Sequence, residues 1–230
     1  TWTSYDALVQ HLNSINGAIK VVKNVPNTIG QGGLRPDQDS LTATRRLYEA
    51  IGSPLDRIKT IHVGGTNGKG TTSHKIAASL VSQGIPTGLF VSPHISSFRE
   101  RFQVNGSLVS EETFMRIVPR ALAVCAREGI LASLFELTFA IACLIFEDAR
   151  CEAVVLEVGL GGLLDATNVV STAFSIICSV SLDHMRILGK SVEEIATVKS
   201  GIFKPGVPCL VGRYTPAALL EKLAAAAGGP

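Results

Sequence analysis

The sequence is poor in aromatic side chains and has almost no excess of charge of either sign. Of its 230 residues 6% are aromatic, and 21 Lys and Arg stand against 19 Asp and Glu, which leaves a formal net charge of +2. So small a charge offers no electrostatic footprint for nucleic acid or for an anionic membrane. No apolar run reaches the roughly 18 residues that a membrane span requires. We therefore expect neither a nucleic-acid partner nor a membrane partner.

The sequence also lacks a CxxC motif, and its cysteines are odd in number: Cys125, Cys143, Cys151, Cys178 and Cys209. Because most of them lie in apolar runs, we expect buried free thiols in a reducing compartment. No signal peptide is visible, since the polar segment 1–13 is typical of an amphipathic helix. These features predict a cytoplasmic protein. The sequence begins without Met, so location in an organelle stays an alternative if a leader has been removed.

Segments typical of buried strands alternate with segments of helical periodicity, and 46% of the residues are hydrophobic. We expect strands over 58–63, 87–91, 153–158, 173–180 and 207–211. We expect helices over 3–15, 40–51, 71–83, 111–128, 133–149 and 191–200, and a last helix from Thr215 onward. The first helix should end at Asn16-Gly17, the segments 20–39 and 92–101 should be irregular loops, and Asn105-Gly106 should turn a short hairpin. This alternation predicts an α/β fold with a mostly parallel, doubly wound sheet.

A glycine-rich loop follows the first expected strand, in the sequence HVGGTNGKGTT that starts at His62. Strand, glycine loop and helix are the order in which backbone N–H groups and a helix N-terminus bind phosphate, and Lys69 stands where it can meet the outer phosphates. The strict P-loop pattern fails, because Val63 occupies its first glycine position and Gly70 separates Lys69 from Thr71. An ordinary βα turn with a surface lysine is the alternative interpretation.

Polar residues fall at the C-terminal ends of three other expected strands or just beyond them, namely Ser92, Glu157 and His184. Because the C-terminal ends of parallel strands share one edge of a sheet, we expect these side chains to lie near the glycine loop. A nucleotide bound there requires Mg²⁺, which prefers oxygen ligands such as the Glu157 carboxylate. Simpler interpretations exist. Ser92 can form a turn before Pro93, Glu157 can be a turn or helix-capping acid, and His184 can pair with its neighbour Asp183.

Two further polar residues lie at expected helix ends. Lys199 stands in the last turn of the helix 191–200, where a cation complements the helix dipole. Ser133 begins the pattern Ser133-x-x-Glu136, a capping box that accounts for both side chains without any ligand. The patterns alone therefore assign neither residue a function.

Five blocks of sequence resemble the folylpolyglutamate synthase and dihydrofolate synthase family, within the Mur-ligase-like ATP-dependent amide ligases. The blocks are HVGGTNGKGTT from His62, SPHISSFRER from Ser92, FELT from Phe135, EVGLGG from Glu157 with DATN from Asp165, and LDH from Leu182 through Leu188-Gly189 to KSGIFKPG from Lys199. They span residues 62–206 in the family's order, which is highly specific. The family's own glycine loop has Gly between Lys and Ser or Thr, so the resemblance accounts for Gly70.

The resemblance implies roles for individual residues. The ATP phosphates would bind at Thr66, Asn67, Gly68, Lys69, Gly70 and Thr71. The family's magnesium ligands match Ser92, Glu157 and His184, and its carbamylated lysine matches Lys199. The residues with an implied catalytic part are Lys69, Lys199 and His184. The positions that contact the pterin substrate in bifunctional bacterial members match Ser133, Leu164, Asp165 and Ala166.

The resemblance further implies a P-loop NTPase-like fold of the Mur-ligase central-domain type and an ATP- and Mg²⁺-dependent ligase. ATP would phosphorylate a carboxylate of dihydropteroate or of a folate glutamyl tail, and the amine of L-glutamate would attack the acyl phosphate. Three alternatives for the acceptor substrate stay open: dihydropteroate, folyl-glutamates, or both. Leu163-Leu164 stand where many relatives carry Arg after Gly-Gly, a departure that bears on the substrate contacts.

Members of the family are longer than this sequence. The resemblance therefore implies that residues 1–230 form an incomplete N-terminal ATP-binding domain without the C-terminal glutamate-ligase domain. We expect these 230 residues alone to bind Mg-nucleotide weakly and not to turn over substrate. A monomer is the family expectation. Two alternatives remain. A cell-wall Mur ligase is disfavoured by the block from Ser92 to Arg101. A non-catalytic nucleotide-binding module is disfavoured by Lys69, Glu157 and His184 but favoured by the expected lack of the C-terminal half.

Overall fold

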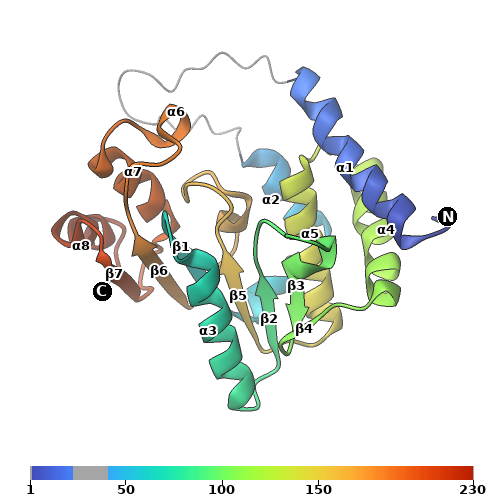
Figure 1. The fold of residues 1–230 in the computed structure, drawn as a ribbon, viewed down its shortest axis with the longest axis horizontal. Helices are drawn as coiled ribbons and strands as arrows, with labels where there is room; N and C mark the ends of the chain where they lie inside the picture. Colours follow the sequence, from blue (N-terminus) through green and yellow to red (C-terminus); the bar gives the residue numbers. More distant parts are fainter. Residues whose placement is uncertain (1, 23–40, 230) are drawn as a thin grey trace.

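The computed structural model describes residues 2–22 and 41–229 of the chain (Figure 1). The helices are α1 (Tyr5–Val22), α2 (Thr42–Ala50), α3 (Lys69–Ser82), α4 (Glu111–Glu128), α5 (Leu134–Asp148), α6 (Met185–Leu188), α7 (Val192–Lys199) and α8 (Ala217–Ala226). The strands are β1 (Lys59–Gly64), β2 (Thr87–Phe90), β3 (Phe102–Val104), β4 (Ser107–Leu108), β5 (Ala153–Glu157), β6 (Phe174–Ser179) and β7 (Cys209–Tyr214). Short 3-10 helices span Pro54–Arg57, Phe98–Arg101, Ala166–Val169 and Ser200–Ile202.

These strands form one sheet in the order β4-β3-β2-β5-β1-β6-β7. β2, β5, β1, β6 and β7 run parallel, whereas β3 pairs antiparallel with both β2 and β4. β1 lies near the centre of the sheet, with Val63 opposite Glu157 on β5 and opposite Ile176 on β6. The C-terminal ends of β1, β5 and β6 therefore lie side by side. The predicted α/β fold with a mostly parallel sheet is confirmed.

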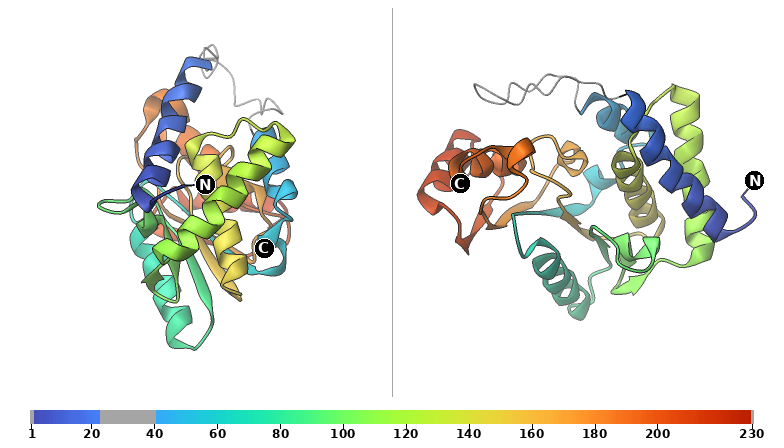
Figure 2. Two further views of the ribbon diagram at one scale, coloured as in Figure 1. Left: turned by 90° about the vertical axis from the view of Figure 1, so that its right-hand side faces the viewer. Right: turned by 45° about the horizontal axis from the view of Figure 1, so that its top comes forward.

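Alternation along the central strands assigns a different layer of helices to each face. Val155 of β5 and Ala77 of α3 share one hydrophobic cluster, whereas Val154 and Leu156 belong to the largest cluster, with α1, α2, α4 and α5. Successive residues of a strand point to opposite faces. α3 thus covers one face, and α1, α2, α4 and α5 cover the other (Figure 2). Ile177 of β6 packs with α7 and α8, so these two helices extend the second layer.

Helix α5 is the apolar centre of the second layer. Ten consecutive residues, from Leu137 to Phe146, are buried, because the sheet, α4 and α1 surround the helix. A fully buried Leu, Ile or Phe side chain stabilises the fold by about 1.5–3 kcal/mol. The helix begins as the sequence predicts: the Ser133 hydroxyl accepts from the Glu136 N–H, and the Glu136 carboxylate accepts from the Ser133 N–H.

Three sequence predictions are wrong at particular residues. α1 does not end at Asn16-Gly17 but continues to Val22. A single Gly inside a helix costs only about 1 kcal/mol relative to Ala, and burial of Leu8 and Leu12 against α4 and α5 stabilises the helix. The part of the expected loop 20–39 from residue 23 onward lies outside the described residues.

The segment 92–101 is not wholly irregular, because its last four residues form a 3-10 helix. Its capping box was missed: the Glu100 carboxylate accepts from the N–H groups of Ile95, Ser96 and Ser97. The helix after the glycine loop starts at Lys69, two residues before the expected start at Thr71, so Lys69 belongs to the first turn of α3. The predicted hairpin at Asn105-Gly106 is confirmed.

All five cysteines are free thiols; Cys143 and Cys151 are buried and the others are partly exposed. Burial raises the pKa of the Cys151 thiol to about 11, which keeps it protonated and unreactive at neutral pH. Among the helices of the described residues, none combines the length and the apolar character needed to cross a membrane.

We predict that Gly88→Ala in β2 destabilises the protein by about 1–3 kcal/mol, the range for overpacking a filled core. A Cβ atom at Gly88 would lie 2.5 Å from Cδ1 of Phe146, a side chain that is fully buried on α5. Urea unfolding monitored by circular dichroism measures the effect, with Ser107→Ala at an exposed position of β4 as the control. Equal midpoints for both variants and the wild type would contradict this packing.

Candidate functional site

The glycine loop connects β1 to α3 through conformations that require glycine. Gly65 has φ +143° and Gly68, the N-cap of α3, has φ +83°, values that side chains with a Cβ rarely adopt. A Cβ at Gly65 would lie 3.1 Å from the backbone nitrogens of Cys178 and Ser179. The loop therefore packs directly on the end of β6, and the helix N-terminus of α3 opens beyond it.

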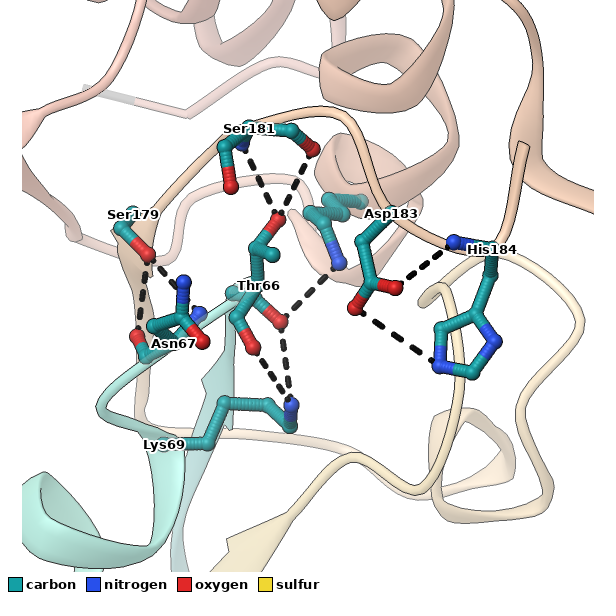
Figure 3. Close-up of polar contacts among 9 residues, drawn as sticks. Thr66, Asn67, Lys69, Ser179, Ser181, Asp183 and His184 are labelled. Atoms are coloured by element: carbon teal, nitrogen blue, oxygen red, sulfur yellow. Dashed lines mark hydrogen bonds and ion pairs between the residues drawn. The ribbon is translucent and has the colours of Figure 1, made fainter.

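Polar contacts fix the loop to the segment that follows β6 (Figure 3). The Thr66 N–H donates to the Ser179 carbonyl at 2.8 Å, and the Ser181 N–H donates to the Thr66 hydroxyl at 3.1 Å. The Ser179 hydroxyl accepts from the Asn67 N–H at 2.9 Å and donates to the Asn67 carbonyl at 3.0 Å. Two of the predicted phosphate-loop residues, Thr66 and Asn67, thus use these groups to hold the loop in place.

Two lysines donate to one carbonyl oxygen of the loop. Lys69 Nζ lies 3.1 Å from the Gly65 oxygen and 3.3 Å from the Thr66 oxygen (Figure 3). Lys199 Nζ lies 2.9 Å from the same Gly65 oxygen. Since Lys69 and Lys199 are 130 positions apart in the numbering, the packing of α7 on the sheet brings them together.

Lys199 is a buried amine, with 3% of its surface exposed. Burial, and next the positive charge of Lys69, lower its pKa to about 8, while Asp183 acts in the opposite direction. A buried ammonium loses hydration that one carbonyl oxygen does not replace. The Lys199 amine is therefore more readily neutral than an ordinary lysine. Sequence analysis named Asp183 as a partner of His184 but missed its electrostatic effect on Lys199.

Glu157 and Ser92 meet at the C-terminal ends of β5 and β2, as their positions predict. The Glu157 Oε2 atom accepts from the Ser92 N–H at 3.0 Å, and a Cβ at Gly70 would lie 3.5 Å from Oε1. Glu157 is 4% exposed, and burial raises its pKa. Both residues line an open cavity of about 480 Å³, together with Gly70, Thr71, His74, Lys75, Val91 and Pro93. The cavity therefore adjoins the first two turns of α3.

His184 lies at a different place from this pair. It is the N-cap of α6 with φ +47°, its side chain is 55% exposed, and its Nε2 atom lies 3.7 Å from Oδ2 of Asp183 (Figure 3). This contact matches the simpler interpretation of His184. Within residues 2–22 and 41–229, no three His, Cys, Asp or Glu side chains gather as a metal site. The metal role of His184 stays a prediction.

His74 is a residue of this cavity that sequence analysis missed. Its Nδ1 atom lies 2.8 Å from the Gly70 carbonyl oxygen one turn earlier in α3, and its Nε2 atom lies 3.3 Å from Nε2 of Gln103. A carbonyl accepts, so Nδ1 carries the proton, and Nε2 accepts from the Gln103 amide. The spacing Gly70-x-x-x-His74 on a helix is the signal that could have revealed the contact.

The four predicted substrate residues meet in a second cavity, of about 240 Å³, although one of them is distant from the others in sequence. Its lining includes Ser133, Leu164, Asp165 and Ala166. The other lining residues are Leu41, Thr44, Phe135, Glu136, Leu160, Gly161, Gly162, Ile187, Leu188 and Val198. Two carboxylates, two hydroxyls and apolar side chains surround the space, and among the residues that the structure describes no basic side chain lines it. Such walls suit an uncharged ligand with N–H donors.

The polar residues of the second cavity also have structural contacts. The Asp165 carboxylate is 5% exposed and accepts from the Leu160 N–H at 2.9 Å and from the N–H and hydroxyl of Thr167. Burial raises its pKa, which these hydrogen bonds oppose. Glu136, besides its capping bond, accepts from the Thr44 hydroxyl at 2.8 Å. The turn after β5 is therefore folded around Asp165.

A second glycine loop, after β5, packs closely on the end of α7. A Cβ at Gly162 would lie 2.6 Å from the Lys199 carbonyl oxygen, and a Cβ at Gly201 would lie 2.4 Å from Cα of Leu163. The Asn168 amide donates to the carbonyls of both Leu163 and Gly201. The backbone of Lys199 thus supports the second cavity while its side chain contacts the first loop.

A parallel α/β sheet with a strand, a glycine loop and a helix that starts at the loop's lysine defines a P-loop-like protein of the Mur-ligase central-domain type. A family model described as the Mur ligase middle domain matches residues 63–209, and the chain belongs to that family. A dihydrofolate synthase/folylpolyglutamate synthase of Bacillus subtilis is 39% identical over 192 residues, which are 81% of this chain and 44% of the relative. The chain spans about half the length of the curated relatives it matches.

Solved structures agree with this assignment. A folylpolyglutamate synthase in complex with AMPPCP and folate superposes with a TM-score of 0.85 at 29% identity, over 99% of this chain and 53% of that one. A bifunctional folylpolyglutamate synthase/dihydrofolate synthase with Mn, AMPPNP and L-glutamate superposes with a TM-score of 0.76 at 34% identity, over 83% of this chain and 46% of that one. The resemblance indicated by the five sequence blocks is confirmed.

We predict that the free energy of unfolding of the wild type rises relative to that of Lys199→Met as the pH increases from about 8 to 10.5. The folded pKa is about 8 and the unfolded pKa is about 10.4. Burial therefore opposes the charged amine, and this cost is fully present below pH 8 and disappears above the unfolded pKa. Urea unfolding at several pH values measures the difference.

Lys199→Arg is the control, because its guanidinium stays charged through this range, so its difference from Lys199→Met should not change with pH. A wild-type profile parallel to that of Lys199→Met would show that the Lys199 amine titrates normally.

Proposed function

We propose that this chain is the ATP-binding part of a ligase that adds L-glutamate to dihydropteroate, to the glutamyl tail of folates, or to both. The observation that carries the proposal is the glycine loop at the N-terminus of α3, with Lys69 in the first helical turn and the Glu157 carboxylate across from Gly70. Relatives with this fold are named as such synthases, and structures of these relatives hold ATP analogues. In residues 1–230 we infer an N-terminal ATP-binding domain.

The ATP phosphates would bind the N–H groups of the first turn of α3, and Lys69 would leave the carbonyls of Gly65 and Thr66 to meet the outer phosphates. In the described structure the Lys69 ammonium contacts neutral carbonyl oxygens only. A phosphate oxygen carries negative charge and is the stronger acceptor for an ammonium. We assign phosphate contacts to the loop from Thr66 to Thr71.

A divalent cation fits at Glu157. Its carboxylate is buried, which raises its pKa, and Oε1 faces the cavity at Gly70. A cation there would favour the ionised carboxylate. Glu157 supplies carboxylate oxygens, and Ser92, whose N–H donates to Oε2, carries a hydroxyl, and oxygen donors of these kinds suit Mg²⁺; one related structure holds Mn. Bound Mg²⁺ would offset the charge of the transferring phosphoryl group. His184 is the third proposed ligand and would have to turn away from Asp183.

Lys199 is the proposed site of carbamylation. A carbamate forms only on a neutral amine, and a pKa of about 8 leaves a larger neutral fraction near pH 7 than an ordinary lysine has. The carbamate would replace a cation with an anion beside the Gly65 carbonyl and Lys69. We propose that Lys199, together with Lys69 and His184, organises the reacting phosphate.

The acceptor would occupy the cavity lined by Ser133, Leu164, Asp165 and Ala166. Its carboxylate would take the γ-phosphoryl group of ATP, and the glutamate amine would then displace phosphate from the acyl phosphate to form the amide. A cell-wall Mur ligase and a non-catalytic nucleotide-binding module are the alternatives. The acceptor-rich walls of the cavity, with two carboxylates and no basic side chain among the described lining residues, favour a heterocycle with N–H donors over a UDP-sugar peptide.

We expect the 230-residue chain to bind Mg-AMPPNP without turning over ATP, and Lys69→Met to weaken this binding roughly 10- to 100-fold, the value of a charge-assisted hydrogen bond. Isothermal titration calorimetry measures the affinity. Lys222→Met, at an exposed position of α8, is the matched control and should bind as the wild type does. Glu157→Gln should abolish the difference between Mg²⁺ and EDTA. Unchanged affinity in Lys69→Met would refute the phosphate assignment.

ADP release by the natural protein that carries this sequence tests the acceptor. L-Glutamate is supplied with dihydropteroate, with a folyl-glutamate, or with a UDP-sugar peptide. Release with either of the first two supports the proposal and identifies the substrate. Release only with the peptide indicates a Mur ligase, and nucleotide binding without release for any acceptor indicates a non-catalytic module.

A further inference from the structure

One buried side chain next to the second cavity has no role in the site described above. His62 lies on β1, immediately before the glycine loop, and is 0% exposed. Its Nε2 atom lies 2.8 Å from the Thr167 hydroxyl, whereas its Nδ1 atom has no hydrogen-bond partner within the described part of the chain. An unpartnered buried nitrogen destabilises a fold, and an apolar side chain at this position would avoid that cost. The Nε2 contact is therefore what the imidazole contributes.

The hydrogen bonds of Thr167 determine the state of this imidazole. The Thr167 hydroxyl donates its single proton to Oδ1 of Asp165, so it can only accept from His62. His62 Nε2 therefore carries a proton and Nδ1 does not. Burial, and next the charge of Lys204, lower the pKa of His62 to about 3, so the ring is neutral. His62, Thr167 and Asp165 form a directed chain that ends on the carboxylate.

This chain of hydrogen bonds ends at the second cavity, because Asp165 lines that cavity. Oδ2 of Asp165 accepts from the Leu160 N–H, and Oδ1 accepts from the N–H and the hydroxyl of Thr167. The Thr167 hydroxyl can rotate toward other acceptors unless a donor occupies its lone pairs. The proton on Nε2 of His62 occupies that position, which leaves the carboxylate as the acceptor for the hydroxyl.

We propose that His62 is a positioning residue that acts through Thr167 to hold the Asp165 carboxylate ionised and oriented toward an N–H-bearing ligand in the second cavity. His62 itself does not touch the ligand. The inference rests on the proposed function for the identity of that ligand as the acceptor substrate, but the hydrogen-bond chain can be measured without any ligand.

The first measurement tests the chain of hydrogen bonds from His62 to Asp165 without any ligand. In ¹⁵N-histidine spectra of the ligand-free protein at neutral pH, His62 should be neutral with its proton on Nε2, and its resonance is assigned by its loss in His62→Gln. Thr167→Val removes the hydroxyl at nearly constant shape and should change the Nε2 signal or the proportions of the two tautomers. A proton on Nδ1 in the wild type, or a spectrum unaffected by Thr167→Val, overturns the proposal.

The second measurement concerns the acceptor. The substitutions His62→Gln and His62→Asn separate the effect of the N–H donor from the effect of burying a polar side chain. Gln can present its amide N–H near the place of Nε2 of His62, whereas Asn is too short. In the natural protein, His62→Asn and Thr167→Val should raise the KM for the acceptor about tenfold with less than a twofold change in the KM for ATP. His62→Gln should restore most of the loss. The double variant His62→Asn/Thr167→Val should be no worse than either single variant.

The outcomes separate the possible explanations. Lower melting temperatures with an unchanged acceptor KM would show that His62 only stabilises the fold, which overturns the proposal. Equal losses of acceptor and ATP affinity would do the same. If the wild type turns over no acceptor, the proposed function fails, and the spectra of the ligand-free protein still decide whether His62 acts on Thr167.

Discussion

The structure depends on the contact between the glycine loop and the C-terminal end of β6 with the residues that follow it. The Gly65 backbone approaches Cys178 and Ser179 so closely that a side chain there would collide with them. Hydrogen bonds at Thr66 and Asn67 complete the contact. Because the loop is held by backbone and by neighbouring strands, its conformation does not need a ligand to organise it, and the helix N-terminus of α3 is open toward the cavity beyond it.

Lys199 couples this loop to the rest of the site. Its Nζ atom contacts the Gly65 carbonyl, and its own carbonyl is packed against Gly162 of the second glycine loop. Asn168 fastens the same region by donating to Leu163 and to Gly201. The glycine loop after β1 and the second cavity are therefore both supported by one short segment at the end of α7.

Much of the fold and part of the site could be predicted from residues alone. The parallel sheet, the helix cap at Ser133 and the meeting of Glu157 with Ser92 follow from local periodicity and from the shared edge of parallel strands. The end of α1 was wrong, since packing outweighs the local tendency of Gly17 to end a helix, and the start of α3 was wrong because Gly70 belongs to its first turn. The effect of Asp183 on Lys199 and the contact of His62 with Thr167 had no adequate local pattern.

The sequence by itself determined the class of the protein, because five short blocks specify glycine turns, strand ends and helix caps at fixed spacing, and each is a local requirement of the backbone. Only the tertiary structure decided which polar and charged side chains meet. Ser133 joins Asp165 in one cavity, and Lys199 shares an oxygen with Lys69. The pKa of Lys199 and the proton position on His62 depend on burial and on partners more than 100 residues away. The glycine pattern therefore specifies the connection from β1 to α3, and the packing around it determines which side chains lie beside that loop.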